Sequence, residues 1–197
     1  MVYISPGNIR MNIPTFSLPA VQTCPGRTDN CEKYCYAKKA EMCYKQVLPS
    51  RRRNYEDTKK KSFVKKATEK ISKIKSEYIR IHESGDFYSQ EYLNKWIKIC
   101  NKFPEKKFLI YTQMYDLDWS NLPDNTVRYW TIWPDSKGVP ETGLKAYVID
   151  DGKNKIGNHK DDVSKIRECT KGKGNSIKCN DCMWCYEGKG DIKFKIH

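Results

Sequence analysis

Short runs of β-branched and aromatic residues alternate along this chain with longer segments whose apolar residues recur at steps of three and four. The runs predict strands, because such side chains suit a pleated surface and turn residues bound each run. Five strands are expected, at residues 16–21, 78–82, 107–112, 127–133 and 144–149. The longer segments predict helices with one apolar face. Their apolar positions are Phe63, Ala67, Ile71, Ile74 and Tyr78 in the first and Tyr92, Trp96, Ile99 and Phe103 in the second.

The alternation of strands and helices indicates repeated βαβ units. Such units form a mainly parallel sheet with helices against it, so we expect an α/β fold, either a curled sheet or a partial (βα) barrel. A barrel can be only partial, because residues 116–125 leave little room for a helix between the third and fourth strands. Beyond residue 150 the chain becomes polar and then rich in cysteine. We therefore expect two parts, a partial α/β barrel over residues 1–150 and a cluster-binding tail over residues 151–197.

Nine cysteines occur among the 197 residues, most of them in two groups. A chain of this length buries enough surface to be stable without disulfides. The sequence shows neither a signal-peptide pattern nor a run of about 18 apolar residues, so we expect a cytoplasmic protein with no membrane contact. Thiols stay reduced in the cytoplasm, and their grouping therefore indicates metal or redox chemistry.

The tail cysteine set follows the spacing C-x9-C-x2-C-x2-C, and its members are Cys169, Cys179, Cys182 and Cys185. Two-residue spacings wrap thiolates around one face of a 4Fe-4S cluster, and a fourth thiolate from a flanking loop closes the site. A structural zinc ion usually takes two separated C-x2-C pairs, which this segment lacks. The spacing favours a closed 4Fe-4S cluster over a zinc site, which stays open as an alternative.

The N-terminal cysteine set consists of Cys24, Cys31 and Cys35, spaced C-x6-C-x3-C, directly after the first predicted strand. Three thiolates leave one iron of a 4Fe-4S cluster free for a small ligand, as an open coordination position distinguishes a catalytic metal site. Cys43 lies eight residues after Cys35 and hence about 12 Å farther along a helix. We interpret Cys43 as a packing residue, and Cys100 has no assigned role.

A polar loop follows the second predicted strand, with Ser84, Gly85 and Asp86 in succession. A carboxylate at the end of a strand, next to a glycine, can receive an ammonium group or a ribose hydroxyl, although an N-capping turn is an alternative. His82 precedes this loop and is a candidate fourth ligand, proton donor or core histidine. Thr112 ends the third predicted strand and is expected to lie beside this loop, where the parallel strands end.

The chain carries a formal net charge of +13. Residues 51–77 contain eleven basic and four acidic residues, which gives this segment a net charge of +7. A solvated helix face explains such a run, and a nucleic-acid site from Arg51 to Lys66 is the other interpretation. Aromatic residues suited to base stacking do not interleave with these lysines, which argues against a single-strand binder.

Two family resemblances follow from these motifs. The stretches "TCPGRTDNCEKYCYAKK", "HESGDFYSQEYLNKW" and "CNDCMWCYEGKG" resemble the gene product 88 family of phages and prokaryotes, and the likeness covers most of the chain. More distantly, three cysteines after the first strand and a Gly-acid loop after the second resemble the radical S-adenosylmethionine enzymes, whose usual cysteine spacing is C-x3-C-x2-C.

The second resemblance implies a function. It implies a 4Fe-4S cluster on the N-terminal cysteine set, an open iron that chelates S-adenosylmethionine, and a Ser84–Asp86 loop that receives its amino group. The tail set would hold a second 4Fe-4S cluster, and a ferredoxin or flavodoxin would supply electrons. We therefore expect a radical S-adenosylmethionine-like enzyme on an unassigned substrate. The alternatives are an electron-transfer or sensing iron-sulfur protein and a zinc-binding nucleic-acid module.

Overall fold

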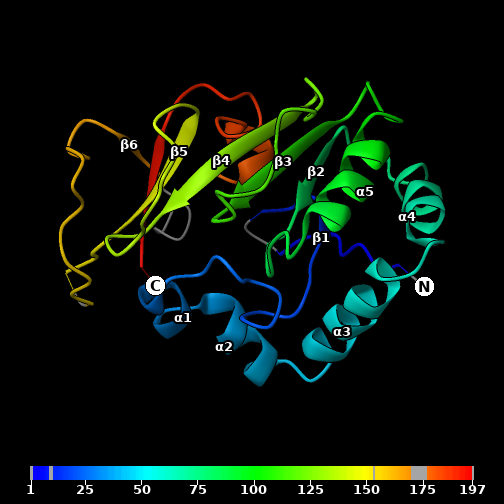
Figure 1. Cartoon of the computed structure of the whole chain (residues 1–197), viewed down its shortest axis with the longest axis horizontal. Coiled ribbons are helices and arrows are strands. Elements are labelled where there is room, and N and C mark those ends of the chain that lie inside the picture. Colours follow the sequence, from blue (N-terminus) through cyan, green and yellow to red (C-terminus); the bar gives the residue numbers. More distant parts are fainter. Residues whose placement is uncertain (1, 9–10, 153, 170–176, 197) are drawn as a thin grey trace.

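The structure is a computed structural model that describes residues 2–8, 11–152, 154–169 and 177–196. Its centre is a seven-stranded sheet in the order β1-β2-β3-β4-β5-β7-β6, in which every strand pair is parallel (Figure 1). The strands are β1 (Thr15–Phe16), β2 (Tyr78–Ile81), β3 (Lys107–Thr112), β4 (Thr126–Ile132), β5 (Leu144–Ile149), β6 (Arg167–Glu168) and β7 (Ile192–Lys195). Within the described residues β1 and β6 form the two edges of this sheet, so it is not a closed barrel.

Six helices accompany the sheet in the described part of the chain. The first four lie between β1 and β2, α5 lies between β2 and β3, and α6 precedes β7. Their bounds are α1 (Asp29–Lys33), α2 (Tyr36–Cys43), α3 (Val47–Thr58), α4 (Phe63–Ile71), α5 (Gln90–Cys100) and α6 (Cys179–Cys182). None of these helices combines the length and the apolar character that a bilayer crossing requires.

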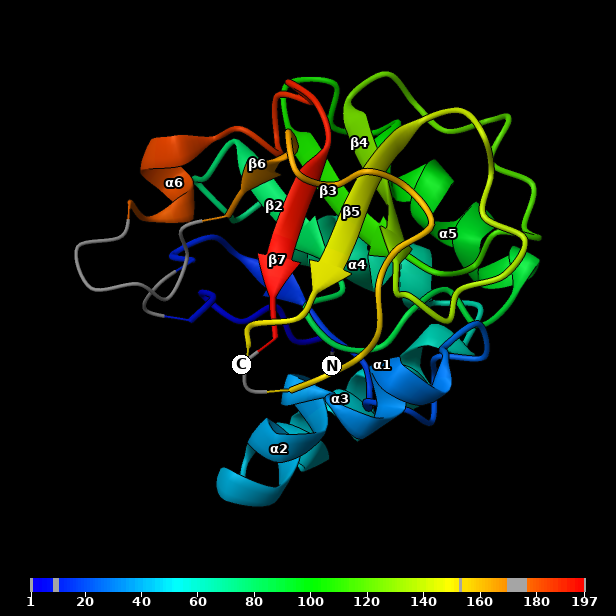
Figure 2. The ribbon, with the colours of Figure 1, turned by 90° about the vertical axis from the view of Figure 1, so that its left-hand side faces the viewer.

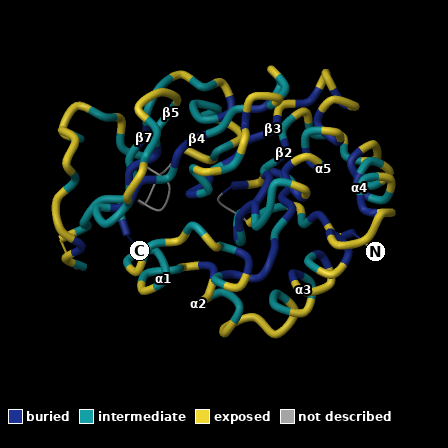
Figure 3. Tube along the Cα trace, viewed as in Figure 1, coloured by how far each residue is buried: buried dark blue, intermediate teal, exposed yellow. Residues whose placement is uncertain are grey.

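Helices α4 and α5 cover one face of the sheet and bury their apolar sides there, as the sequence pattern predicted. Phe63 and Trp96 pack edge-on against the ring of Phe16, with ring centroids 5.8 and 5.2 Å apart. Buried positions follow the strands and the inner sides of the helices, while exposed positions follow the outer turns (Figure 3). Three positions of the predicted faces lie outside the helices: Ile74 follows the end of α4, Tyr78 begins β2, and Phe103 follows the end of α5. The basic segment also forms two helices, separated by residues 59–62.

The opposite face of the sheet is covered by an N-terminal segment and by the tail. Met11 and Ile13 pack there with Leu109 and Tyr129, and Tyr186 of the tail belongs to the same buried cluster. Strand β7 inserts between β5 and β6. The sheet therefore continues across residue 150, where the sequence suggested a division into two parts.

The first strand is shorter than the sequence predicted. Only Thr15 and Phe16 pair with β2, whereas residues 16–21 were expected to do so. Pro19 has no backbone N–H to donate to a ladder, and Val21 adopts a left-handed φ of 64°. The chain therefore leaves the sheet early and carries its next residues toward the cysteines.

Candidate metal centres

The N-terminal cysteine set lies at the edge of the sheet where the parallel strands end. Cys24 comes from the loop after β1, Cys31 lies within α1, and Cys35 directly precedes α2. Thr28 caps the N-terminus of α1, and its hydroxyl accepts a hydrogen bond from the Cys31 backbone N–H at 3.1 Å. Figure 2 shows α1 beyond the arrowheads of β5 and β7. This is the edge at which parallel sheets usually keep their functional residues.

The three thiols of this set act on one another electrostatically. Burial raises the pKa of the Cys24 thiol to about 12, the Asp86 carboxylate raises it further, and ionisation of Cys31 or Cys35 would raise it again. Burial also raises the pKa of Cys31 to about 11. Without a metal these two thiols stay neutral at pH 7. Since a metal binds thiolates, loading the site must release protons.

The end of β3 supports the N-terminal set directly. The Gln113 Nε2 group donates a hydrogen bond to the Cys31 sulfur at 3.1 Å. Gly26 allows this approach, because a Cβ atom there would lie only 2.5 Å from the Gln113 carbonyl oxygen. Gln113 thus supplies an amide donor to a candidate ligand sulfur, as supporting residues around metal ligands commonly do.

Asp86 is brought beside these cysteines, and its carboxylate ties β2 to β3. It accepts hydrogen bonds from Thr112 Oγ1 at 2.7 Å, Gln113 N at 2.9 Å and Phe87 N at 2.8 Å. Burial raises the pKa of Asp86 to about 6 despite these bonds. A carboxylate has about four acceptor positions, so one remains for a ligand. The predicted role in receiving an ammonium group stays a prediction.

The glycine of the same loop, Gly85, occupies a position that has no room for a side chain. Gly85 has a φ of 81°, and a Cβ atom there would lie 2.6 Å from both Leu18 Cβ and Thr23 Oγ1. Ser84 is buried, and its hydroxyl has no hydrogen-bond partner among the described residues. The N-cap of α5 is Ser89, whose hydroxyl accepts from Tyr92 N. The Ser84–Asp86 loop is therefore not the capping turn.

His82 lies in the core on the side of α5, and none of its described contacts is with a cysteine. Its Nε2 atom is 2.8 Å from the Tyr92 hydroxyl, and its ring packs edge-on against Phe87 at 4.6 Å between centroids. Burial, together with the charge of Arg80, lowers the pKa of His82 to about 3, so the ring is neutral at pH 7. This arrangement favours a core histidine, and its ligand or catalytic role stays a prediction.

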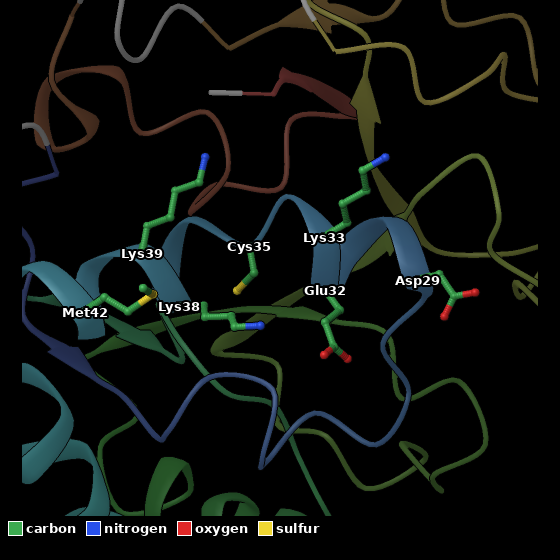
Figure 4. A pocket seen from close by; sticks show the side chains of 7 residues that line it. All are labelled: Asp29, Glu32, Lys33, Cys35, Lys38, Lys39 and Met42. Carbon is green, nitrogen blue, oxygen red and sulfur yellow. The ribbon is translucent and has the colours of Figure 1, made fainter.

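Cys35 faces a cavity of about 450 Å³ on the surface of α1 and α2. Figure 4 shows its sulfur on the side to which Glu32 and Lys38 point, whereas Lys33 and Lys39 point the other way. A small molecule can therefore approach the N-terminal set from solvent. The residues that line the cavity are Asp29, Glu32, Lys33, Cys35, Lys38, Lys39 and Met42.

The two remaining cysteines lie outside both sets. Cys43 is exposed at the last position of α2, so our interpretation of it as a packing residue is wrong. Because α2 is continuous from Tyr36 to Cys43, Cys43 is one helix length away from Cys35, as expected. Cys100 is buried at the end of α5, within the core.

The tail cysteine set gathers on the sheet face opposite α4 and α5. Cys179 and Cys182 are the ends of α6, and Cys185 follows in the next turn. Cys169 directly follows β6, and its N–H donates to the Lys193 carbonyl at 2.8 Å. Burial raises the pKa of Cys185 to about 12, and each of the other three thiols raises it further. Four thiols thus lie near one another, although residues 170–176 are outside the described part.

Aromatic and basic side chains hold the tail set in place. Arg167 places its guanidinium 4.5 Å from the centre of the Trp184 ring, and its Nη2 lies 3.9 Å from the Cys182 sulfur. Trp184 and Tyr129 both donate hydrogen bonds to the Gly190 carbonyl. The sequence did not mark Arg167 as a site residue, because it stands in no motif.

Strand β3 contacts both cysteine sets. The Tyr111 hydroxyl lies close enough to Cys185 to affect the pKa of its thiol, and Gln113, which directly follows β3, donates a hydrogen bond to the Cys31 sulfur. Two residues of extended chain span about 7 Å. The two sets, far apart in the sequence, are therefore linked through two side chains at the end of β3.

The arrangement of the donor atoms can be compared with that of a site for a single metal ion. In the part of the chain that the structure describes, no three His, Cys, Asp or Glu side chains are arranged to hold a metal ion. In a 4Fe-4S cluster each thiolate binds a different iron, so the thiolates stand farther apart than the ligands of one zinc ion. Thiols that lie near one another but do not converge on a single point are compatible with a 4Fe-4S cluster.

One residue of the predicted nucleic-acid surface is not available for binding. Arg51 is only 8% exposed, and its Nη1 group bonds Glu41 at 2.9 Å and the Ala37 carbonyl at 3.1 Å. It joins α3 to α2, which is a structural role. Arg52 and Arg53 are exposed beside it. The basic surface therefore cannot begin at Arg51, and no sequence pattern indicated its pairing with Glu41.

The fold and these two sets define an α/β protein with an all-parallel sheet that gathers cysteines at its edge and on one face. The chain belongs to the gene product 88 family: the family model described as "Gene product 88" matches residues 4–188. This confirms the first resemblance that the motifs indicated.

Two relatives come from mycobacteriophages. The Gene 88 protein of Mycobacterium phage L5 is 28% identical over 151 residues, which cover 68% of this chain and 63% of that protein. The Gene 88 protein of Mycobacterium phage D29 is 28% identical over 123 residues, which cover 55% and 51%. The chain thus spans less than two thirds of either relative's length. No solved structure matches.

Proposed function

We propose that this protein is an iron-sulfur protein that holds two 4Fe-4S clusters, one on the N-terminal cysteine set and one on the tail set. The observation that carries this proposal is the gathering of seven cysteines into two groups around β3. Such clusters supply one-electron transfer. The family model and the relatives' names describe no activity, so they bear on the family alone.

The chain's own residues have separable tasks in this proposal. The Gln113 amide donates to a ligand sulfur in one set, and the Arg167 guanidinium lies beside a sulfur in the other. Both groups favour the negative charge of a thiolate. Tyr111 and Trp184 pack against the tail set and restrict water there.

The N-terminal set suits a radical S-adenosylmethionine-like enzyme. Three cysteines leave one coordination position open, and Cys35 faces a cavity that a small ligand can enter. Strands β1 to β5 neighbour one another in chain order, as in a barrel built from βα units, so we propose that the sheet is a partial (βα) barrel with a cysteine-rich tail. S-adenosylmethionine would occupy the open position beside Asp86, and a ferredoxin or flavodoxin would supply electrons.

The second candidate is an electron-transfer or sensing protein without S-adenosylmethionine. The observation that favours it is the short connection through Tyr111 and Gln113, because closely spaced redox centres suit electron transfer whether or not a substrate is present. A zinc-binding nucleic-acid module has less support, since Arg51 is paired with Glu41.

The test is the metal content of the full chain after anaerobic reconstitution with iron and sulfide. Two 4Fe-4S clusters require about eight irons and eight sulfides per chain, with broad absorption in the visible range. The Cys43→Ser variant is the matched control, because Cys43 is exposed and belongs to neither set, and it should load equally. Two tightly bound zinc ions in the isolated protein, with no iron taken up on reconstitution, would rule out the proposal.

A further inference from the structure

Arg80 is a half-buried cation on the sheet face that carries the tail. Its Nε group donates to the His82 carbonyl oxygen at 3.2 Å, and its Nη1 group donates to the Met11 sulfur at 3.6 Å. Its guanidinium also lies 5.0 Å from the centre of the Tyr111 ring. A carbonyl oxygen, a thioether and a ring face carry no full negative charge. The positive charge of Arg80 is therefore not neutralised by these contacts.

No carboxylate forms an ion pair with Arg80 among the residues that the structure describes. Glu83 acts on it only from a distance, and the Glu83 carboxylate accepts a hydrogen bond from Asn8 at 2.6 Å. By contrast, the buried Arg51 has Glu41 at 2.9 Å. Removing a cation from water is costly unless an anion accompanies it. Arg80 thus has N–H donors and charge available for an anion.

Tyr186 gives a second, independent sign of a missing ligand. It is only 2% exposed, and its hydroxyl has no hydrogen-bond partner among the described residues. Its ring packs against Tyr78 at 5.4 Å between centroids, and Tyr78 stands two positions before Arg80 on the same face of β2. The charge of Arg80 acts on this phenol. A buried hydroxyl without a partner is costly, so it too calls for an acceptor.

The position of the pair connects it with both cysteine sets. Tyr186 directly follows Cys185 of the tail set. Tyr36 directly follows Cys35 of the N-terminal set, and it also lies near enough for its phenol to act electrostatically on Arg80. Arg80 is therefore within electrostatic reach of one tyrosine adjacent to each set.

We propose that Arg80 and Tyr186 form a binding site for the oxyanion group, a carboxylate or a phosphate, of a small ligand. A guanidinium presents planar paired donors that suit an oxyanion, and a phenol adds one further donor. The site rests on the contacts of Arg80 and Tyr186 and needs no cluster in either cysteine set. The further step, that this oxyanion belongs to the substrate, rests on the proposed function.

The experiment is a calorimetric titration of the full chain, as purified and without iron reconstitution, with inorganic phosphate and separately with acetate at low ionic strength. Saturable binding of either probe is expected, and the preferred probe distinguishes a phosphate from a carboxylate ligand. Arg80→Gln should weaken binding roughly 10- to 100-fold, as the loss of hydrogen bonds from a charged donor predicts. Tyr186→Phe should weaken it about 3- to 10-fold.

Arg128→Gln is the matched control. Arg128 is also half-buried and stacked on an aromatic ring, 3.7 Å from the centre of Trp130, and it too lacks a carboxylate partner among the described residues. This variant should bind the probes normally. Absence of saturable binding, binding that survives Arg80→Gln, or an equal loss with Arg128→Gln would each overturn the proposal. If Arg80→Gln does not fold, normal binding by Tyr186→Phe overturns it. Because no iron is involved, these outcomes are independent of whether clusters form.

Discussion

The N-terminal and tail cysteine sets are supported in different ways. The N-terminal set lies at the strand-end edge of the sheet, on a loop and two short helices, and it is backed by Asp86 and Gln113. The tail set lies on a sheet face, around one helical turn and the end of β6, against Trp184 and Tyr111. The cysteines of both sets are partly exposed, so the two sets differ in the number of their thiols and in their position on the sheet. The difference teaches that three cysteines at the edge suit an open site and four on the face suit a closed one.

The largest expected effect separates the two sets by their iron. Cys31→Ala should lower the iron content of the reconstituted protein by about half, because each 4Fe-4S cluster accounts for half of the total. Cys182→Ala should remove the other half, and Cys43→Ser should remove none. Iron and sulfide analysis of the three variants checks this. If either single variant lost all the iron, the two sets would not be independent, and the comparison would fail.

A second prediction concerns the Ser84–Asp86 loop, which lies beside the N-terminal cysteine set only. Gly85→Ala should lower the free energy of unfolding by about 2–4 kcal/mol, since the added Cβ meets Leu18 and Thr23 at 2.6 Å and φ is left-handed. Gly138→Ala is the control: its φ of 66° is also left-handed, but nothing lies within 4 Å. Its cost should be about 1 kcal/mol. Urea denaturation measures both, and equal costs would show that the close approach has no effect.

The supporting hydrogen bonds should act on one set each. Gln113→Leu removes the donor to Cys31 and should weaken iron retention by the N-terminal set about 10- to 100-fold, as losses of supporting residues commonly do. Tyr111→Phe removes the hydroxyl at Cys185 and should act on the tail set alone. Timed iron release to a chelator, measured in the Cys182→Ala and Cys31→Ala backgrounds, tells the sets apart. Equal effects of one variant on both sets would contradict this assignment.

The smallest effect is expected at His82, and it tests whether this residue is a ligand in the N-terminal cysteine set. Its pKa is lowered from 6.5 to about 3 by burial and by Arg80. Between these values the unfolded chain binds a proton on His82 that the folded chain does not, so the contribution of His82 to the free energy of unfolding should fall as the pH falls, by up to about 1.4 kcal/mol per pH unit. The raised pKa of Asp86, about 6, acts in the opposite sense, so the difference between the parent chain and His82→Asn gives the slope due to His82. Urea titrations from pH 7 to 4 measure this slope. His82→Asn should flatten it without loss of iron, whereas Tyr92→Phe, which keeps the imidazole, should preserve it. Loss of iron in His82→Asn would instead identify His82 as a ligand.

Sequence patterns predicted the parts of the fold that depend on local periodicity. The strands at 107–112 and 144–149 have the bounds that their apolar runs indicated, because a buried parallel strand must be apolar on both sides. The apolar face of α5 was predicted from apolar residues at steps of three and four. The length of the first strand was overestimated, because its apolar run continues past Pro19 although its backbone pairing with β2 cannot.

Contacts between distant residues could not be predicted in this way. The bond from Gln113 to Cys31 and the pairing of Arg51 with Glu41 depend on how the chain returns to itself. The exposed position of Cys43 depends on what packs against α2. The same holds for Arg80 and Tyr186, which stand in no motif and come together only on the folded sheet. Cysteine spacing therefore indicated which residues gather, but not what surrounds them.

The central claim is that the N-terminal cysteine set holds an open cluster and the tail cysteine set holds a closed one. The most direct test is electron paramagnetic resonance of the reduced, reconstituted Cys182→Ala and Cys31→Ala variants, each with and without S-adenosylmethionine. S-adenosylmethionine should change the spectrum of Cys182→Ala, which keeps the N-terminal set intact, and should leave that of Cys31→Ala unchanged. A spectral change confined to Cys31→Ala would mean that the open and closed sets are assigned the wrong way round. No change in either variant would contradict the radical S-adenosylmethionine-like function and leave electron transfer or sensing as the role of the two sets.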